Sequence, residues 1–435
     1  MHVSTPGSAG PRDVLPTAPA WLTRTTGAWL GSIVRKVVVD SLANLPEGRL
    51  TIKEGGSSQS FGPGSEDEAV VIEVLDARFW TEVFGAGTNG AGEAYRQGWW
   101  RADDLTGLIR LFARNRDTAN DLESGWARLA APLRAAALRA NRNTVAGSRR
   151  NIEAHYDLSN DFFALILDST MSYSCGIYPT PQASLEEASI EKIDRLCRKL
   201  QLREGDRLLE IGTGWGSLAI HAARHYGASV VTTTISREQA AWAERRIAEE
   251  GLASRIDLRR CDYRDLDGTF DKLVSVEMIE AVGADFYEDF FQVLEARLAD
   301  DGIAAIQAIT IADQYFAEAR DTEDFIKKFI FPGSCIPSIS ALLAASTAAS
   351  DLKLVQLEDI TQHYCRTLAA WRENLLSRRD EVLALGLSDE FLRTWDFYFS
   401  YCEGGFAERH IGDVQMLFAR PGWRGAVDDF GAKSD

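Results

Sequence analysis

A glycine-rich turn after an apolar strand is the segment of this chain that most directly suggests chemistry. Residues 207–216 read RLLEIGTGWG, so a short apolar run ends in Glu210 and continues into Gly212, Gly214 and Gly216. Glycine tolerates positive φ angles and lets a ligand approach the backbone closely. The residues that follow have a helical pattern, and a strand, a glycine turn and a helix in this order are typical of sites for a nucleoside-bearing cofactor. A tight packing turn without a ligand is the alternative.

The spacing of the glycines separates two classes of cofactor. Dinucleotide-binding enzymes carry Gly-x-Gly-x-x-Gly and an acidic residue about 20 positions further on. In this chain the third glycine comes one position earlier, and the next apolar strand, at 229–236, ends without an acid. The pattern therefore favours a methyltransferase that uses S-adenosylmethionine over a dehydrogenase.

Length and composition indicate two domains with ordinary packed cores. The chain has 435 residues, more than one core usually holds, and 45% of them are hydrophobic. No apolar run of about 18 residues could span a bilayer, so we expect a soluble or membrane-peripheral protein. Residues 1–20 are rich in Pro, Ser, Gly and Ala without a signal-peptide pattern, and we predict that they are disordered and that the protein is not exported.

The cysteines favour a reducing compartment and argue against zinc. Six cysteines are scattered along the chain without a C-x-x-C pair. We therefore expect free thiols, a cytoplasmic location and no metal site.

The charge distribution argues against nucleic acid as a partner and suggests a membrane surface. The formal net charge is −17, whereas nucleic-acid phosphates are bound by concentrated Lys and Arg. Residues 126–150 nevertheless contain six arginines and no acidic residue, with apolar side chains at helical spacing. Such a basic amphipathic stretch can lie on an anionic bilayer, which would place the protein at the inner face of the membrane. A solvated helix between domains is the alternative.

Shifts of pattern along the chain predict four segments. A disordered N-terminus (1–20) is followed by a small α+β domain (21–115), a basic linker (116–150) and a larger α/β domain (151–425). The elements expected in the small domain are helices at 21–39, 77–84 and 104–115, strands at 49–53 and 69–75, a turn-rich segment at 55–68 and a glycine-rich turn at 85–92.

Strands and helices alternate in the larger domain. The expected strands are at 207–211, 230–235, 256–260, 272–276 and 302–309, with helical segments between them. This alternation predicts a doubly wound, Rossmann-like parallel sheet, which binds its ligand at the carboxyl ends of the strands.

Five further segments stand out: HYDLSNDFF at 155–163, MSYSC at 171–175, FIFPG at 329–333, YCRTLAAW at 364–371 and, in the small domain, GAGEAYRQGWW at 90–100. They resemble motifs of the cyclopropane fatty acid synthase family, whose members methylate acyl phospholipids with S-adenosylmethionine. With the glycine turn, these motifs occur in the order and spacing of the family, and the resemblance covers nearly the whole chain after residue 20. It also implies that the small domain is lipid-carrier-like.

The resemblance implies a reaction on membrane phospholipids with unsaturated acyl chains. A methyl group would pass from S-adenosylmethionine to the cis double bond, and the resulting carbocation would need alignment and a site without water. Aromatic faces can stabilise a cation, although core packing is the alternative for each ring. The candidate aromatic residues are Tyr173, Phe329, Phe331, Tyr364 and Tyr401.

The resemblance also implies a bicarbonate ion that acts as the base. Of the family's bicarbonate ligands, Cys175 (through its backbone), Glu280, Ile309 (through its backbone) and Tyr364 match. The remaining ligand is commonly His, and this chain has Gln307, whose amide can donate a hydrogen bond but cannot carry a proton. His155 is a further catalytic candidate, with an ordering hydrogen bond inside its own motif as the alternative.

Further matches imply the cofactor contacts. Tyr173 and Ser174 would lie near the methionine carboxylate, and Asp262 and Tyr263 near the adenine. The residues that would shape the methionine and ribose sites are Glu210, Gly212, Gly214, Gly216, Thr234, Ile235 and Gln239.

The product stays open at this stage. Loss of a proton from the transferred methyl closes a cyclopropane, whereas a hydride shift before that loss leaves a methylene branch. Gln307 and the segment 277–283 also resemble the branch of the family that makes 10-methylene and 10-methyl fatty acids. Cyclopropanation is the first expectation and a methylene branch the second. A small-molecule methyltransferase and a non-catalytic lipid-binding protein are the rival functions, and a homodimer is the expected assembly because family members are often dimers.

Overall fold

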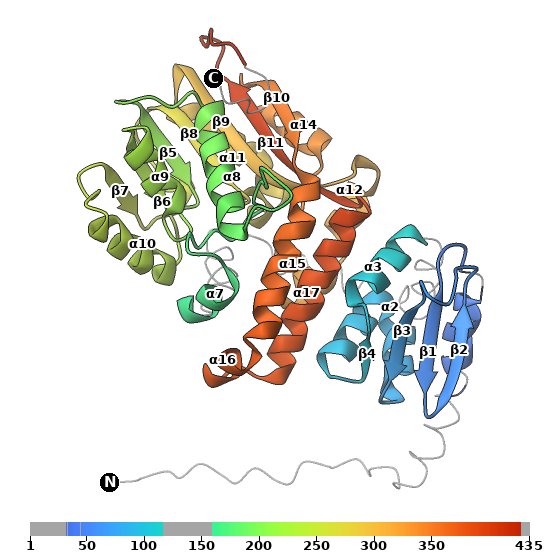
Figure 1. Ribbon diagram of the computed structural model, residues 1–435. Helices are drawn as coiled ribbons and strands as arrows, with labels where there is room; N and C mark the ends of the chain where they lie inside the picture. Colours follow the sequence, from blue (N-terminus) through green and yellow to red (C-terminus); the bar gives the residue numbers. More distant parts are fainter. Residues whose placement is uncertain (1–31, 33, 44, 116–158, 428–435) are drawn as a thin grey trace, which may run out of the picture.

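The computed structural model describes residues 32, 34–43, 45–115 and 159–427. The predicted disordered N-terminus, the basic linker and His155 lie outside the described residues. Figure 1 shows a small N-terminal unit in blue and cyan beside a larger unit that runs from green to red. The described residues thus form an α+β unit and an α/β unit.

The small unit is a four-stranded sheet covered by helices. Its strands have the order β2-β1-β3-β4, in which β1 and β3 are parallel and the other neighbours antiparallel. Residues 34–42 are helical and bury Val34, Val38 and Leu42, in agreement with the end of the predicted first helix. The elements are β1 Leu50–Glu54, β2 Ser57–Phe61, β3 Val70–Val74, α2 Arg78–Arg96, β4 Trp100–Ala102 and α3 Leu105–Arg114.

The predicted glycine-rich turn at 85–92 was wrong, because α2 continues through it. The only break is a kink at Gly87, whose φ is 57°. A Cβ at Gly90 would collide with the backbone carbonyl of Glu82, and one at Gly92 would lie 2.5 Å from the Phe325 ring. These glycines therefore serve close packing inside and against a helix rather than chain reversal.

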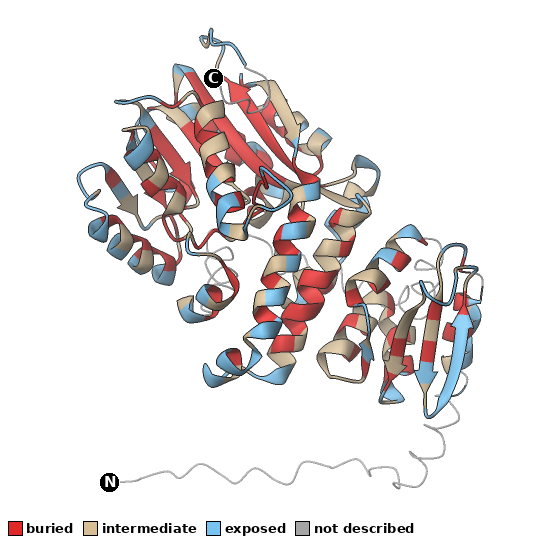
Figure 2. Ribbon diagram, viewed as in Figure 1, coloured by how far each residue is buried: buried red, intermediate tan, exposed pale blue. Residues whose placement is uncertain are grey.

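Two strands of the small unit were not predicted. β2 lies within the segment 55–68 that was expected to be turn, and most of its residues are polar and exposed (Figure 2). An edge strand that faces water lacks the alternation of apolar and polar residues that marks a half-buried strand. β4 has three residues, too few for any periodic pattern.

The larger unit contains a seven-stranded sheet of order β10-β11-β9-β8-β5-β6-β7. The predicted strands are confirmed as β5 Arg207–Ile211, β6 Ser229–Thr233, β7 Ile256–Arg259, β8 Phe270–Val276 and β9 Leu298–Ile311. These five strands are parallel to one another, whereas β11 Ile411–Ala419 pairs antiparallel with both β9 and β10 Lys353–Asp359. The sheet is therefore parallel with an antiparallel edge that was not predicted.

Helices cover both faces of this sheet. Leu208 of β5 packs with α8 and α9, while its neighbour Leu209 packs with α11 and α14, as the alternation of side chains along a strand requires. Both residues are fully buried, and the strands form the buried centre of the unit in Figure 2. The helices are α7 Asn160–Ile166, α8 Leu185–Lys199, α9 Ser217–His225, α10 Arg237–Glu249, α11 Tyr287–Arg297, α12 Asp313–Asp321, α13 Phe325–Phe329, α14 Ile339–Ala349, α15 Thr361–Ser377, α16 Arg379–Ala384 and α17 Asp389–Ala407, with short 3₁₀ turns η1 Tyr263–Asp265, η2 Ile279–Ala281 and η3 Ala284–Phe286.

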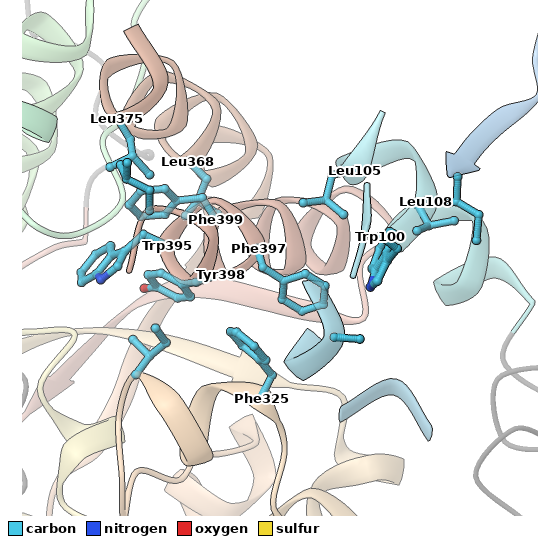
Figure 3. Close-up of a cluster of buried hydrophobic side chains, with 14 of the residues drawn as sticks. Trp100, Leu105, Leu108, Phe325, Leu368, Leu375, Trp395, Phe397, Tyr398 and Phe399 are labelled. Atoms are coloured by element: carbon cyan, nitrogen blue, oxygen red, sulfur yellow. The ribbon is translucent and has the colours of Figure 1, made fainter. Parts of the chain in front are cut away.

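The two units meet along α17. This helix packs against α15 on one side and against α2 and α3 of the small unit on the other (Figure 1). The ring centroid of Phe397 lies 4.5 Å from that of Phe325 and 5.7 Å from that of Tyr95. Phe397 and Phe325 belong to the apolar cluster of Figure 3. The Tyr95 hydroxyl donates to Asp396 at 2.6 Å, and Asp396 also pairs with Arg372 of α15. A continuous core therefore joins the small unit to the larger one.

Within the described part of the chain, no helix combines the length and the apolar character that crossing a membrane would need.

Candidate active site

A cavity of about 190 Å³ lies at the carboxyl ends of the parallel strands, where a doubly wound sheet binds its ligands. The glycine turn after β5, the end of β6 and the start of η1 all contribute to it. All but one of the residues expected to bind the cofactor line this cavity: Tyr173, Ser174, Glu210, Gly212, Gly214, Thr234, Ile235, Gln239, Asp262 and Tyr263.

Gly216 is the exception. It is the N-cap of α9 with a φ of 91°, and a Cβ there would lie 3.2 Å from the Ala243 Cβ of α10. Gly216 therefore serves the packing of α9 against α10 and does not line the cavity. Gly212 and Gly214, with φ of 101° and 52°, do line it, and a Cβ at Gly214 would meet no atom within 4 Å. The turn thus leaves room at the cavity wall that a side chain would fill.

Two buried ionisable side chains line the cavity beside this turn. Glu210 is the second-last residue of β5 and accepts a hydrogen bond from the Thr232 hydroxyl at 2.6 Å, while burial raises the pKa of Glu210 to about 8. The Lys192 ammonium donates to the Ser174 hydroxyl at 2.9 Å, and burial lowers the pKa of Lys192. An acceptor and a donor thus lie at the end of the cavity expected to hold methionine and ribose.

The other expected contacts are ordered by hydrogen bonds within the protein. The Thr234 hydroxyl donates to the Gln239 amide at 3.0 Å, which fixes the start of α10 over the cavity. Asp262 forms a two-point ion pair with Arg264 and is 3% exposed, so its carboxylate already has a partner beside the expected adenine site. Tyr173 donates to the Tyr398 hydroxyl at 3.1 Å.

At one wall of the cavity, donors expected for bicarbonate converge on Glu277. The Cys175 backbone N–H donates to Glu277 Oε1 at 2.8 Å, and the Tyr364 hydroxyl donates to Oε2 at 2.6 Å. The Gln307 amide nitrogen donates to Oε1 at 2.8 Å. Glu277 is the first residue after β8, and its side chain lines the cofactor cavity. A single carboxylate therefore joins Cys175, Tyr364 and Gln307.

Strand pairing explains why Gln307 is so placed. Gln307 of β9 lies opposite Gln415 of β11, whose amide donates to the Gln307 oxygen at 3.0 Å. This contact orients the Gln307 nitrogen toward Glu277 and toward Asp413, which lies 3.1 Å away. Burial raises the pKa of Asp413 well above its usual range, and the negative charge of Glu277 raises it further.

Glu280 occupies a separate position in η2. Its Oε1 accepts the Ile309 backbone N–H at 2.5 Å, whereas its Oε2 is buried and has no hydrogen-bond partner among the described residues. Burial, and then the charge of Glu277, raise the pKa of Glu280 to about 8. Glu280 and Ile309, both expected to bind bicarbonate, therefore pair with each other. No hydrogen bond joins them to the group around Glu277.

The candidate aromatic residues fall into two groups. Measured between ring centroids, Tyr173 lies 5.1 Å from Trp371 and 6.5 Å from Phe331. Tyr364 lies 6.1 Å from the same Trp371 ring. These rings connect the cofactor cavity to the carboxylates. Phe329 and Tyr401 instead lie against Phe325 and Phe397, in the contact with the small unit.

Comparison with known proteins identifies the family. Residues 144–416 match the model of the mycolic acid cyclopropane synthetase family. The chain belongs to this family. It is 39% identical to tuberculostearic acid methyltransferase UfaA1 of Mycobacterium tuberculosis over 343 residues, which cover 77% of this chain and 80% of the relative. It is 35% identical to the cyclopropane-fatty-acyl-phospholipid synthase of Escherichia coli over 351 residues, 80% of this chain and 87% of the relative.

Solved structures of the family agree with the fold. Cyclopropane synthase MmaA2 of Mycobacterium tuberculosis matches with a TM-score of 0.59 and 31% identity, over 62% of this chain and 98% of that structure. Mycolic acid cyclopropane synthase CmaA1, solved with S-adenosylhomocysteine, matches with a TM-score of 0.59 and 29% identity, over 62% of this chain and 98% of that structure. This family member is an S-adenosylmethionine-dependent methyltransferase with a Rossmann-like fold.

Three residues at the site were missed from sequence. Glu277 belongs to the family segment 277–283, but no role was predicted for it. An acidic residue directly after a strand of a doubly wound sheet nevertheless lies where ligands bind. Asp413 interrupts the apolar strand 411–419, and a charge in such a run usually has a specific partner. Lys192 gave no signal, because it has the spacing of an ordinary helix residue.

The described residues contain no cluster of side chains that could hold a metal ion.

Proposed function

We propose that this enzyme transfers the methyl group of S-adenosylmethionine to the cis double bond of unsaturated acyl chains in membrane phospholipids. The similarity to the Escherichia coli cyclopropane-fatty-acyl-phospholipid synthase, over 80% of this chain, supports this substrate. When bound, S-adenosylmethionine supplies an electrophilic methyl group on a positively charged sulfur. The residues Gly212, Gly214 and Glu210 suit this ligand, because the turn leaves space for it and the carboxylate accepts hydrogen bonds from hydroxyls.

The observation that carries the proposal is that Tyr173 belongs both to the cofactor cavity and to a buried aromatic cluster. Its ring forms part of the cavity wall and packs against Trp371, which is 1% exposed. An alkene is a weak nucleophile, so its reaction needs alignment and a cation-stabilising site without water. Aromatic faces provide that stabilisation.

Cyclopropane fatty acids are the first product that we propose. A methylene branch is the second candidate, which the similarity to tuberculostearic acid methyltransferase and the position of Gln307 favour. Because Gln307 hydrogen-bonds the Glu277 carboxylate at 2.8 Å, replacing it by His would change a contact that positions this carboxylate. If this position sets the product, the ratio of the two products differs between the native enzyme and Q307H.

Binding at the membrane, through the small lipid-carrier-like domain and the basic segment 126–150, belongs to the same proposal. A homodimer is also proposed. Vesicle binding should weaken with salt and with loss of anionic lipid, since charge attraction is screened within about 8 Å at physiological ionic strength. Binding that responds to neither would argue for a soluble substrate.

The decisive test uses vesicles of dioleoyl phospholipid with the purified protein and methyl-labelled S-adenosylmethionine. Label should enter the acyl chains, and mass spectrometry of their methyl esters should show the gain of one CH₂ unit. Cyclopropane and methylene products have the same mass but differ in fragmentation and in their response to hydrogenation. Vesicles with saturated acyl chains are the control. Label that stays out of the oleoyl chains would refute the proposed function.

A further inference from the structure

We propose that Glu277 is the general base of this enzyme and that its carboxylate takes the place of bicarbonate. This inference rests on the proposed function, because it assigns the group that removes the proton after methyl transfer. It departs from the bicarbonate site that the family resemblance implies.

The expected bicarbonate donors are already satisfied by carboxylates of the protein. The Cys175 N–H and the Tyr364 hydroxyl bind Glu277 at 2.8 and 2.6 Å, and the Ile309 N–H binds Glu280 at 2.5 Å. The group that remains is Oε2 of Glu280, which is buried, has no hydrogen-bond partner among the described residues and belongs to a carboxyl group whose pKa is about 8. A bicarbonate ion at this position would lie against the Glu277 carboxylate, which already occupies the Cys175 and Tyr364 donors, and could gain only the proton of Glu280, so the residues present do not fit it.

The backbone at Glu277 supports a role for its side chain. Its φ is 46°, a left-handed conformation that is unfavourable for a residue with a side chain and that glycine adopts freely. Strained non-glycine residues of this kind cluster at functional sites. Glycine would thus suit the backbone better, while only a side chain can reach the three donors.

The surrounding charges keep the negative charge on Glu277 rather than on Asp413. Glu277 accepts hydrogen bonds from Cys175, Tyr364 and Gln307, and the buried Lys192 adds a favourable charge. Asp413 accepts one bond, from Gln307, and its Oδ1 has no partner among the described residues. The shared proton therefore stays on Asp413, which can donate to Glu277. Burial still raises the pKa of Glu277 above its usual value, so it is a stronger base than an exposed carboxylate.

The reaction balances with this one base. The alkene π electrons form the bond to the methyl carbon, the C–S bond breaks with its electron pair left on sulfur, and a carbocation forms on the other alkene carbon. Glu277 then takes a proton from the transferred methyl. The C–H electron pair closes the cyclopropane or, after a hydride shift, becomes the π bond of a methylene branch. No oxidant or further reactant is needed.

The first test compares native turnover with and without bicarbonate. In carbon dioxide-free buffer with oleoyl phospholipid vesicles, we expect the same rate before and after addition of sodium bicarbonate, with sodium chloride as the control for ionic strength. A several-fold stimulation by bicarbonate would overturn the inference. A native enzyme that methylates no acyl chain under either condition would instead refute the proposed function, which keeps the two failures distinct.

The second test uses E277Q and E277G. The glutamine variant keeps the size of the side chain but is not a base, so turnover should fall at least about 100-fold while calorimetry shows unchanged S-adenosylmethionine binding. The glycine variant relieves the backbone and frees the Cys175 and Tyr364 donors, so added bicarbonate should restore part of its rate. The same addition should leave E277Q inactive, because the amide still fills the position. Native-like turnover by E277Q would overturn the inference.

Discussion

At the residue scale, Cys175 acts through its backbone, not its thiol. Its N–H holds Glu277, while its sulfur is fully buried, and burial raises the pKa of the thiol well above its usual value. A neutral buried thiol is a poor nucleophile. We therefore expect C175A to keep turnover within about threefold of the native enzyme, with a small loss of stability from the lost packing. Abolished turnover in a folded C175A, measured with labelled S-adenosylmethionine, would show that the sulfur has a chemical role.

The glycine turn makes a second prediction at this scale. A valine at position 214 would need a φ of 52° and would occupy the cavity wall, so cofactor binding should fall at least about 100-fold by calorimetry. Gly251 is a matched control, since its φ is 67°, a Cβ there meets nothing within 4 Å, and it lies outside the cavity lining. G251V should lose similar stability and bind normally. Equal binding by both variants would remove the turn from the cofactor site.

Most of the residues that line the cavity could be predicted from sequence because a strand, a glycine turn and a helix are local in the chain. The proposed base could not, because its choice depends on which carboxylate reaches the donors. Glu277 and Glu280 are three residues apart, and the resemblance pointed to Glu280. Only the structure shows that the Cys175 and Tyr364 donors converge on Glu277.

At the scale of elements, β5 and η2 each hold a buried carboxyl group, which makes stability depend on pH. Glu210 and Glu280 have folded pKa values of about 8, compared with 4.5 when unperturbed. Between pH 6 and 8 the unfolded chain has lost both protons while the folded protein still holds them. The free energy of unfolding should therefore decrease as pH rises through this window, by about 2 kcal/mol for each group.

Urea denaturation at a series of pH values measures this dependence. E280Q removes one titrating group, so its stability should fall less steeply between pH 6 and 8 than that of the native protein. Above about pH 8 the contribution of these two groups to the free energy of unfolding should no longer change with pH in either protein. An unchanged slope in E280Q would mean that Glu280 is already ionised at pH 6.

The elements were predictable where an apolar run was buried on both faces of the sheet. The five parallel strands met this condition, and their predicted ranges differ from the structure by a few residues. β10 escaped prediction because its residues are half-buried or exposed, and β11 because it is added antiparallel after a long run of helices. The prediction of a turn at the glycines of the small unit was wrong for a different reason. A pattern of glycines cannot reveal that another helix will pack against them.

At the scale of the whole molecule, the contact between the units predicts cooperative unfolding. Gly92 of α2 faces Phe325 and Phe397, and an alanine Cβ there would lie 2.5 Å from the Phe325 ring. We expect G92A to lose about 1–3 kcal/mol and to separate the unfolding of the two units in calorimetry. Gly85 lies in the same helix with open space around it, so G85A should be neutral or slightly stabilising. Identical thermal transitions for both variants would mean that this contact contributes little.

α17 has a consequence for the ancestry of the protein. Four consecutive residues, Asp396–Phe397–Tyr398–Phe399, are buried. Asp396 and Phe397 face the small unit, whereas Tyr398 hydrogen-bonds Tyr173, which lines the cavity expected to bind the cofactor. The solved relatives align over 98% of their length with only 62% of this chain. In a descendant that lost the small unit, Phe397 would become exposed to solvent. Tyr398 would still be under selection, because it contacts Tyr173 at the candidate active site. Across the lineage, positions 92, 325 and 397 should therefore be inherited and replaced as a set, whereas position 398 should be retained independently of them.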